Sequence, residues 1–223
     1  MKSHFELSPA EYEAGRQGHL QHRRIHLVAR EVALAGAGRT VLEVGCGPGD
    51  VLAAVAQTRP DLQFVGIDVD EAMIDHARTA HGAPNVAFEC VGLGAESLDL
   101  RAGFVFGIDV LHHVHDLDPF VDAVAAVLEP GGTWVVVEPN SRNPYIWLHQ
   151  ERMRRAGLDE DHFRRRPFER AALRAGLRVV DRSTAFVVPG AVQSVPPLVA
   201  RAERVLERVP GLGGSVVYRL SPA

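Results

Sequence analysis

A glycine-dense turn carries the residue types expected of a nucleotide-type cofactor site. Residues 40–50 read TVLEVGCGPGD, so a buried-strand pattern leads directly into Gly45, Cys46, Gly47 and Gly49. Glycines let the backbone bend sharply, and their N–H groups can approach a ligand that a Cβ would keep away. The helix predicted to begin at Asp50 points the positive end of its dipole at the same place.

The spacing of these glycines discriminates between cofactors. A dinucleotide-binding turn has its third glycine at the sixth position, where it lets helix and strand pack closely, and this chain has Asp50 there. Nicotinamide or flavin binding is therefore disfavoured. Glu43, two residues before the turn, would repel a pyrophosphate but suits a ligand that bears a sulfonium and an ammonium group. S-adenosylmethionine is such a ligand.

A second acid supports the same ligand. Residues 63–68 form an apolar run that ends in Asp68, about 20 residues beyond the glycines, where an acid can accept hydrogen bonds from ribose hydroxyls. Asp70 is better placed to cap the following helix, so the two acids can have different roles. Val69 and Met73, next to them, are candidates for packing against the adenine.

Candidate catalytic residues follow the next strands. His112 and His113 come just after Asp109 at the end of the fourth predicted strand, and Glu138 ends the fifth. Ligands bind at the carboxyl edge of parallel strands. His112 and Glu138 could therefore form a general base and the carboxylate that orients it. The alternative is that the two histidines only cap and pack the next helix.

Together these segments resemble the class I S-adenosylmethionine-dependent methyltransferases. The resemblance rests on residues 41–49, 65–68, 109–113 and 128–132, in the family's order, and it is closer to the small-molecule branch that includes quinone-biosynthesis-like enzymes. It implies S-adenosyl-L-methionine as cofactor, S-adenosyl-L-homocysteine as product, and a small organic acceptor that is methylated at oxygen, with carbon or nitrogen as alternatives. A catalytically idle cofactor-binding regulatory protein and a nucleic-acid methyltransferase are the competing interpretations.

The sequence departs from the family at one position. Family members usually have an acid in the loop after the third strand that reads the adenine amino group, and Gly94 takes its place here. Adenine recognition could pass to Glu96, to a nearby backbone carbonyl, or to packing. We therefore expect Gly94, Ala95 and Glu96 to line the adenine end of the site.

Composition narrows the class of protein. A chain of 223 residues, 46% of them hydrophobic, can bury one sizeable core. Its formal net charge of −4 gives no general attraction to nucleic acid. No apolar run is long enough for a membrane span and the N-terminus is not a secretion signal, so a cytoplasmic location is expected. The two cysteines are expected to be free thiols. No metal site is expected, because the histidines at 112, 113 and 115 point to different faces.

Alternating strands and helices must position these residues. The pattern predicts an α/β fold with a Rossmann-like, doubly wound sheet that is mostly parallel, and the resemblance adds an antiparallel last strand. Strands are expected at residues 41–44, 63–68, 86–90, 104–109, 133–138, 177–181 and 215–220.

The ends of the chain are expected to surround this sheet. Residues 1–39 would form an N-terminal helical cap, with Tyr12 touching the cofactor or simply packing. Residues 40–223 would form the methyltransferase domain, with a substrate-covering insert around 140–166. The amphipathic segment 196–209 is predicted to belong to the core, with a lid or a dimer contact as alternatives. A homodimer is a further expectation.

Overall fold

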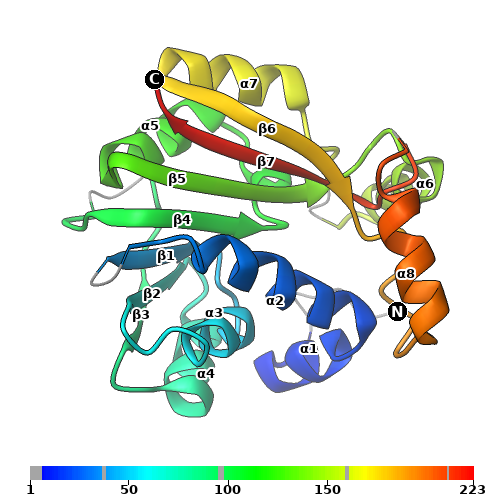
Figure 1. The fold of residues 1–223 in the computed structure, drawn as a ribbon, viewed down its shortest axis with the longest axis horizontal. Helices are drawn as coiled ribbons and strands as arrows, with labels where there is room; N and C mark the ends of the chain where they lie inside the picture. Colours follow the sequence, from blue (N-terminus) through cyan, green and yellow to red (C-terminus); the bar gives the residue numbers. More distant parts are fainter. Residues whose placement is uncertain (1–6, 37–38, 95–97, 159–160, 210) are drawn as a thin grey trace.

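One seven-stranded sheet organises the protein (Figure 1). The computed structural model describes residues 7–36, 39–94, 98–158, 161–209 and 211–223. The strands follow the order β3-β2-β1-β4-β5-β7-β6. They are β1 (Thr40–Val44), β2 (Gln63–Asp68), β3 (Val86–Cys90), β4 (Ala102–Ile108), β5 (Leu128–Pro139), β6 (Leu177–Ala185) and β7 (Ser215–Pro222). Pairs from β3 to β5 are parallel, and β7 runs antiparallel to both of its neighbours. The predicted fold class is confirmed.

Helices cover both faces of this sheet. They are α1 (Pro9–Arg16), α2 (His19–Val32), α3 (Asp50–Ala56), α4 (Glu71–His81), α5 (Leu117–Val127), α6 (Pro144–Arg155), α7 (Arg165–Arg174) and α8 (Pro197–Leu206), with a short 3-10 turn, η2 (Leu111–His113). Successive strand residues point to opposite faces. Val135 and Val137 of β5 therefore pack with α2, α3 and α4, whereas Trp134 and Val136 pack with α5 and α7.

Local signals set two of the helix starts. Asp70 caps α4, because its carboxylate accepts hydrogen bonds from the backbone N–H groups of Ala72 (2.9 Å) and Met73 (3.2 Å), as predicted. Helix α5 begins at Leu117. Asp116 is the cap there, and its side chain accepts from the N–H of Asp118.

Helix α8 buries its polar face and exposes its apolar face, so the prediction that its apolar residues belong to the core is wrong. Leu198 and Val205 are 78% and 60% exposed, and Val199 and Leu206 are exposed as well. The buried residue of the helix is Glu203. Its carboxylate accepts hydrogen bonds from His19, Arg23 and the backbone N–H of Val188. These charged partners hold the polar face of α8 inward.

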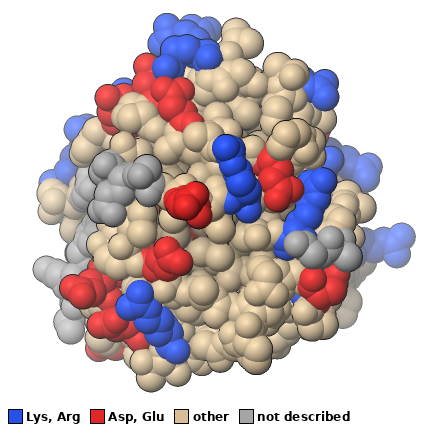
Figure 2. All heavy atoms as spheres, turned by 90° about the vertical axis from the view of Figure 1, so that its left-hand side faces the viewer, with Lys and Arg blue, Asp and Glu red and all other residues tan. Residues whose placement is uncertain are grey.

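The two edges of the sheet differ. The arrows of β4 and β5 end on the side where α1, α6 and α8 gather (Figure 1). The opposite edge, where the parallel strands begin, carries acidic and basic side chains interspersed (Figure 2).

Within the described part of the chain, no helix has the length and apolar character needed to cross a bilayer. Both cysteines, Cys46 and Cys90, are free thiols as predicted.

A substitution in the glycine turn tests how tightly the turn is packed against its neighbours. Gly49 has φ of 84°, and a Cβ there would lie 2.6 Å from Cε1 of Phe88 and 2.9 Å from Cβ of Ala77. We expect Gly49→Ala to lower the free energy of unfolding by about 2–4 kcal/mol, from backbone strain plus overpacking. Gly157→Ala is the matched control, since its φ is 80° but a Cβ would meet nothing within 4 Å. Urea unfolding of both variants separates the cost of backbone strain from the cost of the steric clash. Equal losses of unfolding free energy in the two variants would contradict the tight packing around Gly49.

Candidate functional site

The glycine turn connects β1 to α3 and is hydrogen-bonded to the end of β2. Gly45, Gly47 and Gly49 all have positive φ, at 68°, 51° and 84°. The N–H groups of Gly45 and Cys46 donate to the carbonyl of Ile67 at 2.8 and 3.0 Å. Burial raises the pKa of the Cys46 thiol, with the charge of Glu43 adding to it, so this cysteine stays protonated. The turn is a rigid, backbone-lined edge against which a ligand can lie closely.

Asp68 faces this turn from the tip of β2. Its Oδ2 accepts a hydrogen bond from the N–H of Gly47 at 2.8 Å, and its Oδ1 accepts from the N–H of Asp70 at 3.0 Å. The structure therefore brings Asp68 to the glycine turn and leaves helix capping to Asp70. Each of its oxygens can accept a further hydrogen bond, because a carboxylate oxygen has two lone pairs.

Glu43 is a buried acid beneath the turn and is only 3% exposed. Among the described residues, its Oε2 has no hydrogen-bond partner. Burial raises the pKa of Glu43 well above its usual value, and the nearby charges of Asp50 and Asp68 raise it further, against the opposing effect of Arg16. A cation bound beside this carboxyl would satisfy the orphaned oxygen and favour its ionised form.

Helices α1 and α2 bring basic side chains to the same place. Arg24 forms an ion pair with Asp109, the residue that follows β4, and Asp109 has φ of 57°. Arg16 stacks over the ring of Tyr12 and donates to its hydroxyl at 2.8 Å. Burial lowers the pKa of Arg16, but the charges of Tyr12, Asp50 and Asp109 outweigh it and raise that pKa overall.

These arginines were not among the residues predicted for the site. The sequence shows them only as polar positions of an amphipathic N-terminal segment. Their role depends on α1 and α2 folding back over the sheet edge. Gln21 of α2 likewise donates to Asp50. Tyr12 lies by the turn, since a Cβ at Gly47 would be 4.0 Å from its Cε1.

The adenine end of the predicted site is only partly described. Gly94 is exposed with φ of 93°, and a Cβ there would lie 3.1 Å from the backbone nitrogen of Phe120. The positive φ and the close approach of Phe120 both disfavour a side chain at this position, which is a physical reason for the missing acid. Val69, which follows Asp68 directly, is 75% exposed, and Met73 in the first turn of α4 is half-buried. Ala95 and Glu96 lie outside the described residues.

The structure brings His112 and Glu138 together. Nδ1 of His112 is 2.8 Å from Oε2 of Glu138, which is fully buried. Glu138 also accepts hydrogen bonds from the backbone N–H groups of Val110 (2.8 Å), Leu111 (2.7 Å) and His112 (3.3 Å). The two oxygens of Glu138 therefore act only as hydrogen-bond acceptors, as those of an ionised carboxylate do. Nδ1 of His112 must then donate to Glu138, which leaves Nε2 as the accepting nitrogen of the ring. The ring of His113 lies 4.0 Å from that of His112, centroid to centroid.

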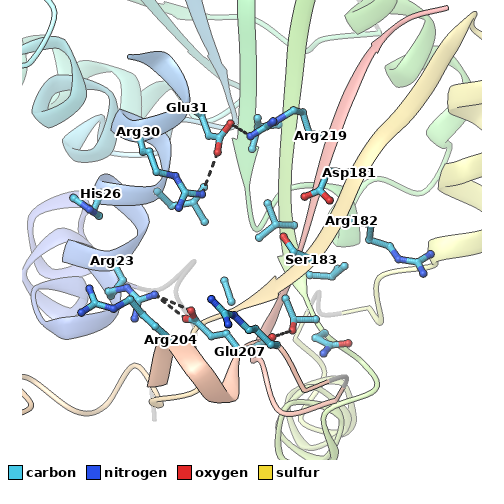
Figure 3. Close-up of a pocket in the computed structure, with 18 of the residues that line it drawn as sticks. Arg23, His26, Arg30, Glu31, Asp181, Arg182, Ser183, Arg204, Glu207 and Arg219 are labelled. Atoms are coloured by element: carbon cyan, nitrogen blue, oxygen red, sulfur yellow. Dashed lines mark hydrogen bonds and ion pairs between the residues drawn. The ribbon is translucent and has the colours of Figure 1, made fainter. Parts of the chain in front are cut away.

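A separate cavity of about 750 Å³ lies between α2, α8 and strands β6 and β7 (Figure 3). Of the predicted site residues that the structure describes, none lines this cavity. Its walls are joined by ion pairs: Arg23 contacts Glu207 at 2.8 Å, and Arg30 and Arg219 both contact Glu31. The lining arginines, which outnumber the carboxylates, are Arg23, Arg30, Arg142, Arg165, Arg182, Arg204, Arg208 and Arg219. This excess gives the cavity a positive potential.

Docking of α8 over this cavity should depend on pH. Burial raises the pKa of Glu203, but the hydrogen bonds from Val188 and His19 and the charge of Arg23 outweigh it, so that pKa is lowered. In the unfolded chain the pKa of a glutamate is about 4.3. Because the pKa of Glu203 is lower than this in the folded protein, ionised Glu203 stabilises the fold above about pH 4.3, and this stability is lost as the pH falls through the folded pKa.

We therefore expect Glu203→Gln to lower the free energy of unfolding by about 1–3 kcal/mol at neutral pH. The difference from wild type should shrink on acidification. Arg201→Gln, at an exposed position of the same helix, is the control and should change little. Urea unfolding as a function of pH measures both; a Glu203→Gln effect that does not vary with pH would contradict the assignment.

Comparison with known proteins identifies relatives. Residues 16–182 match the family model of the methyltransferase domain. A Mycolicibacterium smegmatis protein described as a probable S-adenosylmethionine-dependent methyltransferase is 36% identical over 122 residues, which are 53% of this chain and 45% of that protein. A ubiquinone biosynthesis O-methyltransferase of Bordetella avium is 35% identical over 123 residues, 53% of this chain and 50% of that protein. The chain spans about half the length of the curated relatives it matches.

A solved structure shares the whole fold. It is a complex of the Haloferax volcanii Trm112 methyltransferase activator with a proposed methyltransferase, and the similar chain has a TM-score of 0.72 at 19% identity. The match covers 100% of this chain and 99% of that one. At this level of identity the likeness concerns the fold alone.

Proposed function

Because this chain belongs to the methyltransferase domain family and S-adenosylmethionine is its methyl donor, we propose that it methylates a small organic acceptor at an oxygen atom. The observation that carries the choice of oxygen is the contact between His112 and Glu138. Hydroxyl and phenol acceptors must lose a proton during transfer, so they need a general base, whereas a neutral amine can attack with its own lone pair. The similarity to a ubiquinone biosynthesis O-methyltransferase supports the same choice.

The residues present fit the cofactor. Glu43 offers its orphaned Oε2 to the ammonium group, and Asp68 offers its carboxylate to the ribose hydroxyls. Arg16 and Arg24 also have buried Nε atoms without a hydrogen-bond partner among the described residues, and they suit the methionine carboxylate. The bound cofactor supplies a methyl group on a sulfonium, which is already a good leaving group. The protein then has to align the acceptor with that methyl group and exclude water.

His112 would take the acceptor proton. The bound cofactor would supply its methyl group to the acceptor oxygen and leave as S-adenosylhomocysteine. The acceptor proton passes to Nε2 of His112, and the resulting imidazolium is stabilised by the Glu138 carboxylate 2.8 Å from Nδ1. In the competing interpretation, the two histidines only cap and pack the next helix.

We also propose roles for the segments around the site. Residues 1–39 act as the cap over the cofactor, which the inward-facing Arg16 and Arg24 support. The insert around 140–166 covers the acceptor, and Tyr145, Trp147 and Leu148 give it exposed apolar side chains. Homodimer formation stays a prediction.

Turnover assays test the proposal directly. The full chain would be incubated with S-adenosylmethionine and three acceptor sets: catechols, small carboxylic acids and primary amines. We expect S-adenosylhomocysteine and a methylated product only with oxygen acceptors. Turnover restricted to amines would overturn the choice of oxygen. Tight cofactor binding without turnover on any set would favour the idle regulatory protein, and methylation of an oligonucleotide would favour the nucleic-acid alternative.

A further inference from the structure

We propose that Glu13, His76 and His81 form a binding site for a divalent transition-metal ion of the Zn²⁺ class, which fastens the cap helix α1 to α4. Glu13 lies on α1, and both histidines lie on α4. The two helices pack against each other. The sequence alone does not reveal this site, because its ligands come from two segments that lie far apart along the chain.

The ligand atoms already have the required spacing. Oε2 of Glu13 is 2.8 Å from Nε2 of His76, and Oε1 of Glu13 is 3.2 Å from Nε2 of His81. One ligand atom from each residue can be chosen so that all three lie within 4.8 Å of one another. Tetrahedral Zn²⁺ with bonds of about 2.0–2.1 Å places its ligands about 3.4 Å apart. Small side-chain rotations are enough to reach that geometry.

The chemistry of the three donors also favours a transition metal. Two imidazoles and one carboxylate form a set that binds Zn²⁺ with a fourth position left for water, and imidazole also suits Ni²⁺ and Co²⁺. The three side chains are only 20–22% exposed, so the site is shielded but still open to a water molecule. Nε2 of His81 is buried, and its 3.2 Å contact with Oε1 of Glu13 does not have the geometry of a hydrogen bond. A metal ion would satisfy it.

The position of the site links it to the cofactor. The same helix α1 carries Tyr12 and Arg16, which lie by the glycine turn and next to Asp50 and Asp109. A metal that holds α1 on α4 would therefore hold these two side chains in place. Metal and S-adenosylmethionine should then strengthen each other's binding by the same factor, because coupling between two sites is reciprocal. This coupling rests on the proposed cofactor site, whereas metal binding itself does not.

Calorimetry of the full chain, freed of metal with EDTA, tests the site. Titration with ZnCl₂ should show one tight site per chain. His76→Ala, His81→Ala and the shape-preserving Glu13→Gln should each weaken it at least tenfold. His22→Ala is the matched control, since it removes an exposed histidine of α2 and should leave binding unchanged. The site is wrong if the wild type binds no Zn²⁺ tightly, or if all three ligand variants bind like wild type.

Spectroscopy and hydrogen exchange check the geometry without relying on activity. Co²⁺ in the wild-type site should give the intense visible bands of a four-coordinate ion, and the variants should lose them. Zn²⁺ should slow amide exchange in α1 of the wild type but not of Glu13→Gln. Far-UV circular dichroism would establish that each variant is folded. Weak six-coordinate Co²⁺ spectra, together with unchanged exchange in α1, would overturn the proposed clamp.

The coupling has its own measurement. Saturating Zn²⁺ should tighten S-adenosylmethionine binding by about 5- to 150-fold in the wild type, the usual range for coupled sites, and should have no effect in Glu13→Gln. Unchanged cofactor affinity would overturn the coupling. If the chain failed to bind S-adenosylmethionine, the cofactor site would be wrong, yet the Zn²⁺ titration would still decide the metal site.

Discussion

We expect His112→Ala to bind S-adenosylmethionine like the wild type but to transfer its methyl group about 10²–10⁴-fold more slowly, the range that general-base catalysis contributes. The reason is that Nδ1 of His112 is occupied by its 2.8 Å hydrogen bond to Glu138. Nε2 is therefore the ring nitrogen that would take the proton from the methyl acceptor. The effect should fall on kcat rather than on cofactor affinity. Rates of S-adenosylhomocysteine formation with a catechol acceptor, together with calorimetry, measure the two separately.

The pH profile gives a second readout that a structural role would not affect. Wild-type kcat should fall on acidification, because a general base acts only in its deprotonated form. The His112→Ala profile should lack this limb. His115→Ala, at an exposed position in the same loop, is the control and should keep the wild-type rate. A His112→Ala enzyme that keeps both rate and profile would leave His112 with a packing role only.

Glu138 is a positioning residue in this scheme, and its substitution should have a broader effect. Glu138→Gln replaces an acceptor oxygen with an NH₂ group that faces the N–H donors of Val110, Leu111 and His112. An unsatisfied buried donor costs about 1–3 kcal/mol. We therefore expect this variant to lose both stability and turnover.

The second large effect concerns Glu43 and the cofactor. Burial raises the pKa of Glu43 well above its usual value in the free protein. A bound ammonium group favours the carboxylate, so S-adenosylmethionine binding should release a proton while the pH lies below that raised pKa. Affinity should then rise with pH until the pH passes the raised pKa. Calorimetry in buffers with different ionisation enthalpies measures the proton released.

Glu43→Gln should remove both the charge and the pH dependence. A hydrogen bond to a charged group is worth about 1.5–3 kcal/mol, which corresponds to a loss of affinity of about 10- to 150-fold. Glu31→Gln is a matched control, because Glu31 is also buried but pairs with Arg30 and Arg219 away from the turn. If Glu43→Gln bound the cofactor like wild type, Glu43 would not contact the ammonium group.

Much of the fold could be predicted because its signals are local. The apolar runs of the central strands β1, β4 and β5 are short and nearly continuous, which is how strands buried on both faces appear in a sequence. The glycine turn and the cap at Asp70 depend on the conformation of a few neighbouring residues. Such features depend little on what the rest of the chain does.

The orientation of α8 could not be predicted in the same way. Its apolar and polar residues form two clear faces, and burial of the apolar face is the usual outcome. The polar face is buried instead, because His19 and Arg23 of α2 supply partners for Glu203. These partners lie nearly the whole length of the chain away, so no local pattern contains them.

The sequence by itself thus determined the sheet, the glycine turn and the acids Glu43 and Asp68 that belong to it, since strand ends fix their positions. Only the tertiary structure decided which side chains meet there. Arg16 and Arg24 reach the site through the fold-back of α1 and α2, and Glu13 meets His76 and His81 through the packing of α1 on α4. The physical reason is that backbone conformation follows from neighbouring residues, whereas contacts between distant residues follow from how whole helices pack.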